Sequence, residues 1–530
     1  MYNKGLFHEW VPKPVQLLLI LLGLPPFLVV SGVYANNIAR MSGGMGAMSE
    51  FFSMANNATF IGMMAVMPII FRLKQFIRSK ILVIGGLLSM CLLSAVCYTT
   101  DSERIIVLAS LLIGLLKMSG IIEFVLPVIF TISPSLKREV FYPVFYPIAI
   151  GIGQLSAYFF AIIAYHIGWE RVYLCTISYM LFLALLFVIF MHNRRGMRKV
   201  PLYQLHWVSL IIFVVILMLL NYIFTFTKYH GWFSSPEIAY LSIATVFLLA
   251  FFIYRQMTLK RPYLPLSVFT QKKVYASTLL IGLMGIFFAS SSIQSTFFTG
   301  VLGYSSETNA LLNLIMLPGF ICSAVVSYFW FKGNGKMKGL VLMGFGSFVL
   351  SHLIFYFLFA PVVEITYFIF PFFLKGLGMG FLYISLTTYN SRDLDMQEMF
   401  SAVTIFILFR SFIGTAFFGA VFAWAFYKLR LQNGIDLVNG MDVTDSFGLI
   451  RGGGMQLYGA VQIQAILLAA KQLFGYIIVA GIACLIYVLQ HRFEPLHHRQ
   501  VVLMSKRLRG EDISGYKLQN AMAEAIPMAV

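Results

Sequence analysis

Four charged residues lie inside long apolar stretches of the chain, and they are the first candidates for chemistry. They are Lys117, Glu123, Lys375 and Arg410. A charge at the centre of a bilayer costs about 2.5 kcal/mol or more, so such residues usually contact ions or solutes, carry protons or pair with one another. Three cations against one carboxylate favour an anionic or amphipathic neutral solute over a lipophilic cation, which would require carboxylates.

Glu123 has three possible roles. Because burial disfavours the charged form of a carboxyl group, it could exchange a proton. It could instead form a structural pair with a loop base such as Lys137, or contact the solute. It follows Lys117 by six residues, which is about 9 Å along a helix and about 240° around it, so the two side chains do not share a face.

The other candidates are polar residues that could line a transport path. We expect Lys117, Lys375, Gln294 and Asn36 to line a central cavity. Arg410 is expected to be structural.

Composition indicates which elements must hold these side chains. The chain has 530 residues, of which 60% are hydrophobic and 11% are charged, whereas soluble proteins carry about 25% charged residues. Long apolar runs, for example 105–133 and 207–226, reach the roughly 20 residues that a helix needs to cross a bilayer. They do not alternate as barrel strands do. The sequence therefore predicts an all-α integral membrane protein.

Hydropathy predicts fourteen spans, near 15–36, 52–71, 81–99, 105–132, 140–166, 172–192, 206–226, 236–254, 274–300, 308–331, 339–359, 364–389, 398–427 and 467–490. If the N-terminus is cytoplasmic, 27 of the 38 Lys and Arg residues fall in inner segments, seven in outer segments and four in spans. This bias follows the positive-inside rule and places both termini in the cytoplasm.

A short internal repeat suggests two related halves. Residues 116–120 (Leu-Lys-Met-Ser-Gly) in span four resemble 374–378 (Leu-Lys-Gly-Leu-Gly) in span twelve. The spacing predicts a six-helix bundle over 1–203, an inserted helix pair with a linker over 204–272 and a second six-helix bundle over 273–490. An outer loop is expected near 428–466, and a basic cytoplasmic tail over 491–530. Gly120 and Gly378 are expected to serve close packing of helices.

The order of several short motifs resembles a known family. Residues 229–234 (Tyr-His-Gly-Trp-Phe-Ser) and 261–269 (Arg-Pro-Tyr-Leu-Pro-Leu-Ser-Val-Phe) flank span eight, and 317–319 (Leu-Pro-Gly) lie in span ten. With Arg410 and Gly414 in span thirteen, they resemble the fourteen-span drug:proton antiporters of the major facilitator superfamily. The resemblance implies the major facilitator fold, proton-coupled efflux of small molecules, multidrug resistance and a conformational role for Arg410 and Gly414.

The sequence departs from that family where the family couples transport to protons. The loop after span two lacks the family's aspartate and reads Phe-Arg-Leu-Lys-Gln-Phe over 71–76. Span five lacks the Gly-Pro-x-x-Gly-Gly signature, and Ser31 stands where span one usually has an acidic residue. Proton coupling therefore depends on Glu123 or on groups that these motifs do not reveal.

Other classes of protein fit less well. The chain has no phosphate-binding Gly-x-x-x-x-Gly-Lys-[Ser/Thr] loop. It has no His-x-x-x-His set typical of a membrane-embedded enzyme, and the acid pair Asp393 and Asp395, in an inner loop, is expected to cap a helix or solvate a turn. The five cysteines fall in apolar runs and are expected in the core. We expect no catalytic residue, metal, cofactor or nucleic acid. Expected partners are the lipid bilayer, a small-molecule substrate and, from the resemblance, a periplasmic adaptor and an outer-membrane channel, with the chain in the inner membrane. A transporter-like scaffold without coupled transport remains an alternative.

Overall fold

The computed structural model describes residues 6–29, 33–34, 36–132, 138–193, 205–333, 335–392, 394, 396–440, 443–491 and 493. In these ranges thirteen helices are long and apolar enough to cross a membrane, and Lys13–Leu28 is a shorter apolar helix. All fourteen predicted spans therefore correspond to apolar helices, and the first is shorter than expected. The chain is an all-helical, multi-pass membrane protein.

The first half of the chain contributes helices α1 (Lys13–Leu28), α2 (Ile38–Met45), α3 (Ser49–Val66), α4 (Ile70–Phe76), α5 (Ser79–Thr99), α6 (Glu103–Ile132), α7 (Arg138–His166) and α8 (Glu170–Phe190). Two further helices follow, α9 (Trp207–His230) and α10 (Pro236–Thr258). The second half contributes α11 (Lys272–Leu283), α12 (Gly285–Ala289), α13 (Ser291–Gly300), α14 (Ser306–Leu314), α15 (Met316–Lys332), α16 (Met337–Leu358), α17 (Ile369–Ser391), α18 (Met396–Leu408), α19 (Gly414–Asn439) and α20 (Val443–Gln490).

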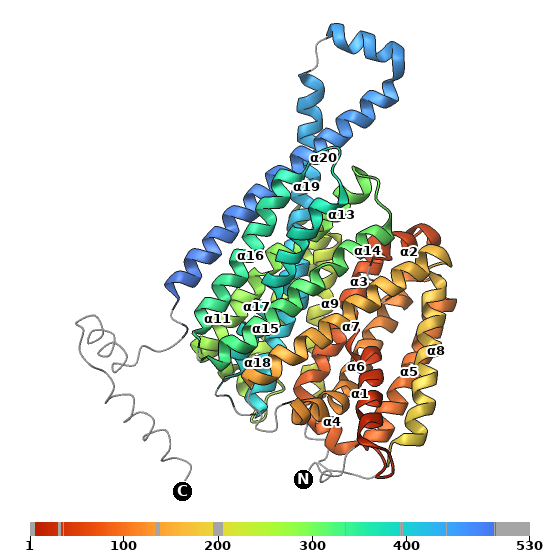
Figure 1. Cartoon of the computed structure of the whole chain (residues 1–530), viewed down its shortest axis with the longest axis vertical. Helices are drawn as coiled ribbons and strands as arrows, with labels where there is room; N and C mark the ends of the chain where they lie inside the picture. The colour runs from red at the N-terminus through yellow and green to blue at the C-terminus, as the bar shows by residue number, and fades with distance from the viewer. Residues whose placement is uncertain are drawn as a thin grey trace, which may run out of the picture.

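The helices gather in two groups side by side (Figure 1). Helices α1–α8 form one group and α11–α20 the other, and α7 packs against α14, α15 and α17 across the boundary. Helix α9 contacts α3 of the first group and α19 of the second, and α10 packs on α9. Candidate side chains on α6 and α17 therefore belong to different groups of helices.

Glycines bring the backbones of α3 and α6 into direct contact. A Cβ atom added to Gly62 would overlap the carbonyl oxygen of Leu111, and one added to Gly114 would overlap that of Thr59. Each glycine therefore lies against the residue three positions before the other glycine. Small residues permit this close approach, on which helix packing in a membrane depends because lipid removes most of the hydrophobic driving force.

The second half repeats this crossing between α15 and α17. A Cβ on Gly319 would overlap the carbonyl oxygen of Phe373, and a Cβ on Gly376 would overlap that of Met316. The three-residue spacing is the same as in the first half. The two halves therefore share a packing device as well as a short sequence similarity.

A second device also occurs in both halves. The Lys80 ammonium at the start of α5 donates to the carbonyl oxygen of Val188 in the last turn of α8, at 2.7 Å. Lys338 at the start of α16 donates in the same way to Leu489 O at the end of α20, at 2.5 Å. The final carbonyls of a helix lack partners within it, and lysine is well suited to satisfy them.

The first span is interrupted, where an uninterrupted helix over 15–36 was expected. Pro25 and Pro26 lie inside α1, and Val29 has an extended backbone. Prolines supply no backbone N–H and disfavour a continuing helix. The chain resumes as α2, and Asn36 before it has a positive φ of 61°. Non-helical backbone at membrane depth is tolerated where it is buried in protein or lines a cavity.

The segment near 428–466 is helical rather than a loop. Helix α19 extends to Asn439 and α20 begins at Val443, so the two form a helical hairpin that projects beyond the other helices (Figure 1). Helix α20 has 48 residues, and its first turns bend away from the axis of the rest of the helix (Figure 1). Its polar, Gly-rich sequence suggested a loop, but extending an established helix is easier than nucleating one.

The linker after α10 is anchored to the first half. The Tyr263 hydroxyl donates to Ala65 O at 2.6 Å, and the backbone N–H of Leu264 donates to Gln256 Oε1 at 3.1 Å. Burial raises the pKa of Tyr263 above its usual value, so the phenol remains a donor. The motif that carried the family resemblance therefore fixes the linker against α3.

Three cysteines lie in the core as expected, namely Cys91, Cys97 and Cys484. Cys175 on α8 and Cys322 on α15 are exposed instead. Apolar composition does not separate lipid-facing from core positions in a membrane helix, because both are apolar.

The glycine crossings yield a stability prediction. Gly114→Ala and Gly376→Ala should each destabilise the protein by about 1–3 kcal/mol, because the added methyl overlaps a backbone carbonyl. Gly85→Ala is the control, since a Cβ there meets nothing within 4 Å. Thermal unfolding of the purified variants in detergent measures the effect. Equal midpoints for all three variants would show that the crossings do not limit stability.

Candidate functional site

The four intramembrane charges occupy separate places. Lys117 lies among the helices of the first half, Lys375 among those of the second, and Arg410 at the boundary between them. Glu123 pairs with a residue of α4. The sequence suggested that the two lysines line one cavity, but the structure places them in separate halves.

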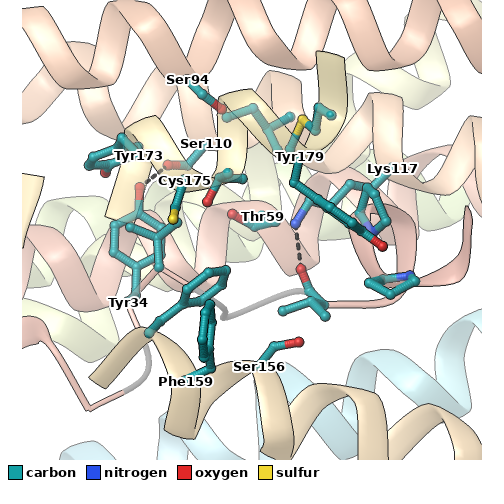
Figure 2. Close-up of a pocket in the computed structure, with 18 residues that line it drawn as sticks. Tyr34, Thr59, Ser94, Ser110, Lys117, Ser156, Phe159, Tyr173, Cys175 and Tyr179 are labelled. Atoms are coloured by element: carbon teal, nitrogen blue, oxygen red, sulfur yellow. Dashed lines mark hydrogen bonds between the residues drawn. The ribbon is translucent and has the colours of Figure 1, made fainter. Parts of the chain in front are cut away.

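Lys117 contacts the broken end of α1. Its ammonium donates to the carbonyl oxygen of Val29 (Figure 2), which immediately follows the last residue of that helix. A cation at a helix C-terminus is favourable because the helix dipole is negative there. Lys117 also lines a cavity of about 430 Å³ whose described walls come entirely from residues 25–180. That cavity lies within the first half.

Lys375 is fully buried in the second half. It donates to Ser291 Oγ at 2.8 Å and to Gln294 Oε1 at 2.9 Å, both on α13. Gln294 is thus a hydrogen-bond partner of this lysine inside the second group of helices. Its Nε2 has no hydrogen-bond partner among the described residues. His352 lies nearby and shares a hydrogen bond of 2.9 Å with Ser290.

The two lysines have related but shifted positions. Each extends from the glycine-crossing helix of its half to a helix that is interrupted, α1 or the α11–α12–α13 series. Relative to the equivalent crossing glycines, Lys117 follows Gly114 by three residues, whereas Lys375 precedes Gly376 by one. The difference of four residues is about one helical turn, so the short sequence repeat does not align structurally equivalent positions.

Glu123 is ion-paired with Lys74. Lys137, the loop base suggested from the sequence, lies outside the described residues. Lys74 Nζ lies 2.8 Å from Glu123 Oε2, and the two side chains are 7% and 0% exposed. Of the carboxylates in the described residues, Glu123 is the one whose side chain is buried. Its Oε1 has no hydrogen-bond partner among these residues. Lys74 belongs to the segment 71–76 that lacks the family's aspartate.

Arg410 lies in a π-helical segment, Phe409–Ile413, between α18 and α19. π-Helical turns are rare and often occur at functional sites. The guanidinium lies 4.5 Å from the ring centroid of Tyr383 and 5.8 Å from that of Tyr146. Its Nη1 also donates to the Tyr146 hydroxyl at 3.4 Å. Tyr146 is on α7 and Tyr383 on α17, so Arg410 contacts both halves.

The surroundings of Arg410 are polar and aromatic. The Tyr146 hydroxyl and Thr387 Oγ1 are 2.7 Å apart, and the Tyr142 hydroxyl donates to Ser391 Oγ at 3.4 Å. No ion pair of Arg410 with a carboxylate occurs in the part of the chain that the structure describes. Sequence reasoning missed Tyr146 and Tyr383 because nothing local distinguishes them among 27 tyrosines.

A separate set of contacts joins the halves near α2 and α14. Asn313 Nδ2 donates to Asn36 Oδ1 at 3.3 Å, and Arg40 Nε donates to Ser306 Oγ at 3.0 Å. Asn36 therefore links the interrupted first span to the second half. These bonds are side chain to side chain, so they can exchange for water if the halves separate.

The three candidate glycines lie at close contacts. A Cβ on Gly414 would lie 2.7 Å from Gly282 O, and one on Gly378 would lie 2.8 Å from Gly344 O. A Cβ on Gly120 would overlap the ring of Phe27. Gly414 directly follows the π-helical segment that carries Arg410, so it fixes that segment against α11.

The buried ion pair gives a second stability prediction. Lys74→Met should destabilise the protein by about 3–5 kcal/mol, because it leaves the Glu123 carboxylate buried without its cation. The double variant Lys74→Met/Glu123→Leu should recover much of that loss. Thermal unfolding in detergent tests both. A single variant as stable as the parent would mean that the pair does not stabilise the fold.

Comparison with known proteins places the fold among transporters. A solved structure of a peptide transporter POT has a TM-score of 0.57 at 13% identity and covers 92% of this chain and 97% of its own. The nucleoside transporter NupG has a TM-score of 0.51 at 11% identity and covers 90% of this chain and 100% of its own. No model of a known protein family matches the chain.

One curated relative has a short match in sequence. Citrate exporter 1 of Yarrowia lipolytica is 26% identical over 120 residues, which are 22% of this chain and 18% of that protein. The match thus spans less than a fifth of the relative. At these identities the likeness establishes the fold alone: the chain has the fold of the major facilitator transporters.

Proposed function

We propose that this protein is a secondary active transporter that exports small amphipathic molecules carrying a negative charge, by alternating access and coupled to protons. The observation that carries the proposal is Arg410, which lies at the boundary of the two halves between Tyr146 and Tyr383. Substrate sites of two-halved transporters lie between the halves near the bilayer midplane. A guanidinium with aromatic rings suits a carboxylate attached to an apolar body.

Several further observations support transport of an anion. Lys117, Lys375 and Arg410 have no ion pair with a carboxylate among the described residues, so the membrane-embedded part carries excess positive charge. The structural neighbours are transporters, and the short relative is by name an exporter of an organic anion. The resemblance to drug:proton antiporters agrees with efflux, and a lipophilic cation is disfavoured by the same charges.

We propose Glu123 as the proton carrier. Protonation would neutralise the carboxylate and weaken its bond to Lys74, which lies on the short helix α4 after the second span. Release of this contact would loosen α4 from α6, and so link proton uptake to movement at one end of the first half. The unpartnered Oε1 of Glu123 offers the position where a proton could bind.

We also propose that the chain lies in the inner (cell) membrane with both termini cytoplasmic, where the positive-inside rule places them. The α19–α20 hairpin would then project outward. It carries exposed apolar residues on one face of α19, namely Leu431, Ile435 and Val438. A periplasmic adaptor, coupled to an outer-membrane channel, is the partner that we propose for this face. Capture of an adaptor from native membranes should disappear on charged substitution of these residues.

Flux through proteoliposomes tests the substrate class. Efflux or counterflow should be observed for amphipathic monoanions and be weaker for matched quaternary cations. Arg410→Gln should reduce anion flux at least tenfold, and Arg410→Lys should recover part of it because charge is retained while the planar fork is lost. Preferred transport of quaternary cations, unaffected by Arg410→Gln, would contradict the proposal. Absence of gradient-driven movement of every solute tested would favour an uncoupled scaffold.

A pH gradient tests the coupling. Glu123→Gln should abolish the stimulation of transport by a pH gradient while counterflow of the same solute persists, because exchange of substrate needs no net proton movement. The Lys74→Met variant provides a comparison that removes the ion pair but keeps the carboxyl group. Full stimulation in Glu123→Gln would assign coupling to another group.

A further inference from the structure

The cavity beside Lys117 differs from the boundary site at Arg410 in position and in its surroundings. It is enclosed by α1, the turn after it, α3, α5, α6, α7 and α8, all in the first half. Its volume of about 430 Å³ falls within the range of about 300–1,000 Å³ typical of small-molecule sites. Nothing in the proposed transport path at Arg410 requires it.

One side of the cavity is lined by hydroxyl groups. The Tyr173 side chain is 3% exposed, and its hydroxyl lies beside that of Tyr34, with which it interacts. Tyr34 and Ser110 beside it share a hydrogen bond of 2.6 Å (Figure 2). These hydroxyls make this side of the cavity polar without adding charge to it.

Lys117 supplies the charge. Its ammonium has three donors, of which Val29 O accepts one. The side chain is 8% exposed and points into the cavity (Figure 2). A single ammonium with neutral hydroxyls around it matches a monoanion, whereas a dianionic phosphate would need further cations or donors.

The other side of the cavity is apolar and opens toward lipid. Phe159 on α7 is 56% exposed, and Cys175 on α8 is also exposed. Cys175 shares a helix face with Phe182 and Ile189, at intervals of seven residues, and both are exposed apolar residues. A face of this kind on a spanning helix contacts the hydrocarbon. The mouth between α7 and α8 is therefore accessible from within the bilayer.

We propose that this cavity binds the carboxylate end of a single-chain anionic amphiphile that enters from the bilayer between α7 and α8. The carboxylate pairs with the Lys117 ammonium, and the chain leaves past Phe159 into lipid. This site goes beyond the proposed function, and its occupancy does not depend on transport through the boundary site.

The exposed native cysteines provide the test. Dodecanoate, at a concentration below its micellar threshold, should slow alkylation of Cys175 by N-ethylmaleimide at least threefold, because the bound chain covers the mouth. Cys322, exposed on α15 in the other half, should react at an unchanged rate. Peptide mass spectrometry of the full-length protein in nanodiscs reads both rates in one sample.

Matched ligands separate the contribution of the negative charge from that of the apolar tail. Dodecyltrimethylammonium has the same tail and the opposite charge, and it should not protect Cys175. Acetate and citrate carry carboxylates without the tail, and they should not protect it either. Equal protection by the cation, or protection by the soluble acids alone, would overturn the proposal, as would equal slowing at Cys322.

Two variants assign the effect to the cavity. Lys117→Gln should abolish protection, because it removes the charge that pairs with the carboxylate. Lys375→Gln, which removes the buried lysine of the other half, should retain protection. Full protection in Lys117→Gln would exclude this cavity as the site. Loss of flux in Arg410→Gln with protection intact would separate this site from the transport path.

Discussion

Direct contact between helix backbones is the constraint on which the rest of this structure depends. In each half, two spanning helices cross at a pair of glycines, one on each helix. Each glycine lies against the carbonyl group of the residue three positions before the other glycine, so the two backbones touch. Lipid removes the hydrophobic driving force that packs soluble helices, so close van der Waals contact must replace it. The crossing helices α6 and α17 carry Lys117 and Lys375, and the crossings therefore set the depth at which both charges lie.

Buried charges are accommodated here by neutral polar groups of neighbouring helices as well as by opposite charges. Lys117 uses the free carbonyl at the broken end of α1, and Lys375 uses Ser291 and Gln294 beside an interruption in the ninth span. Glu123 has a true ion pair, with Lys74. The interruption of α1 supplies an unpaired backbone carbonyl at membrane depth, and such backbone is tolerated where it is buried in protein or lines a cavity. The same interruption of α1 forms one wall of the cavity in the first half.

The proposed functions lie in two places, one at the boundary between the halves and one within the first half. Arg410 contacts α7 and α17 through aromatic rings and a tyrosine hydroxyl, so relative motion of the halves must change its surroundings. The polar contacts near α2 and α14 also span the boundary. Lys117 and Glu123, in contrast, make their described contacts within the first half. A solute at Arg410 and an amphiphile at Lys117 would therefore act on different parts of one molecule.

The sequence by itself determined the class of protein, the positions of thirteen of the fourteen expected spans and the charges that lie within them. These follow from hydropathy and from the cost of charge in lipid, which are properties of single segments. Only the tertiary structure decided that Lys117 and Lys375 lie in separate halves, that Lys74 neutralises Glu123, and that Tyr146 and Tyr383 flank Arg410. Each of these pairs joins residues from different helices, and an apolar span carries no local signal of which face meets protein and which meets lipid. The hairpin formed by the ends of α19 and α20 was also not predicted. Its polar composition is typical of a loop, and only the structure shows that the two spanning helices continue into it.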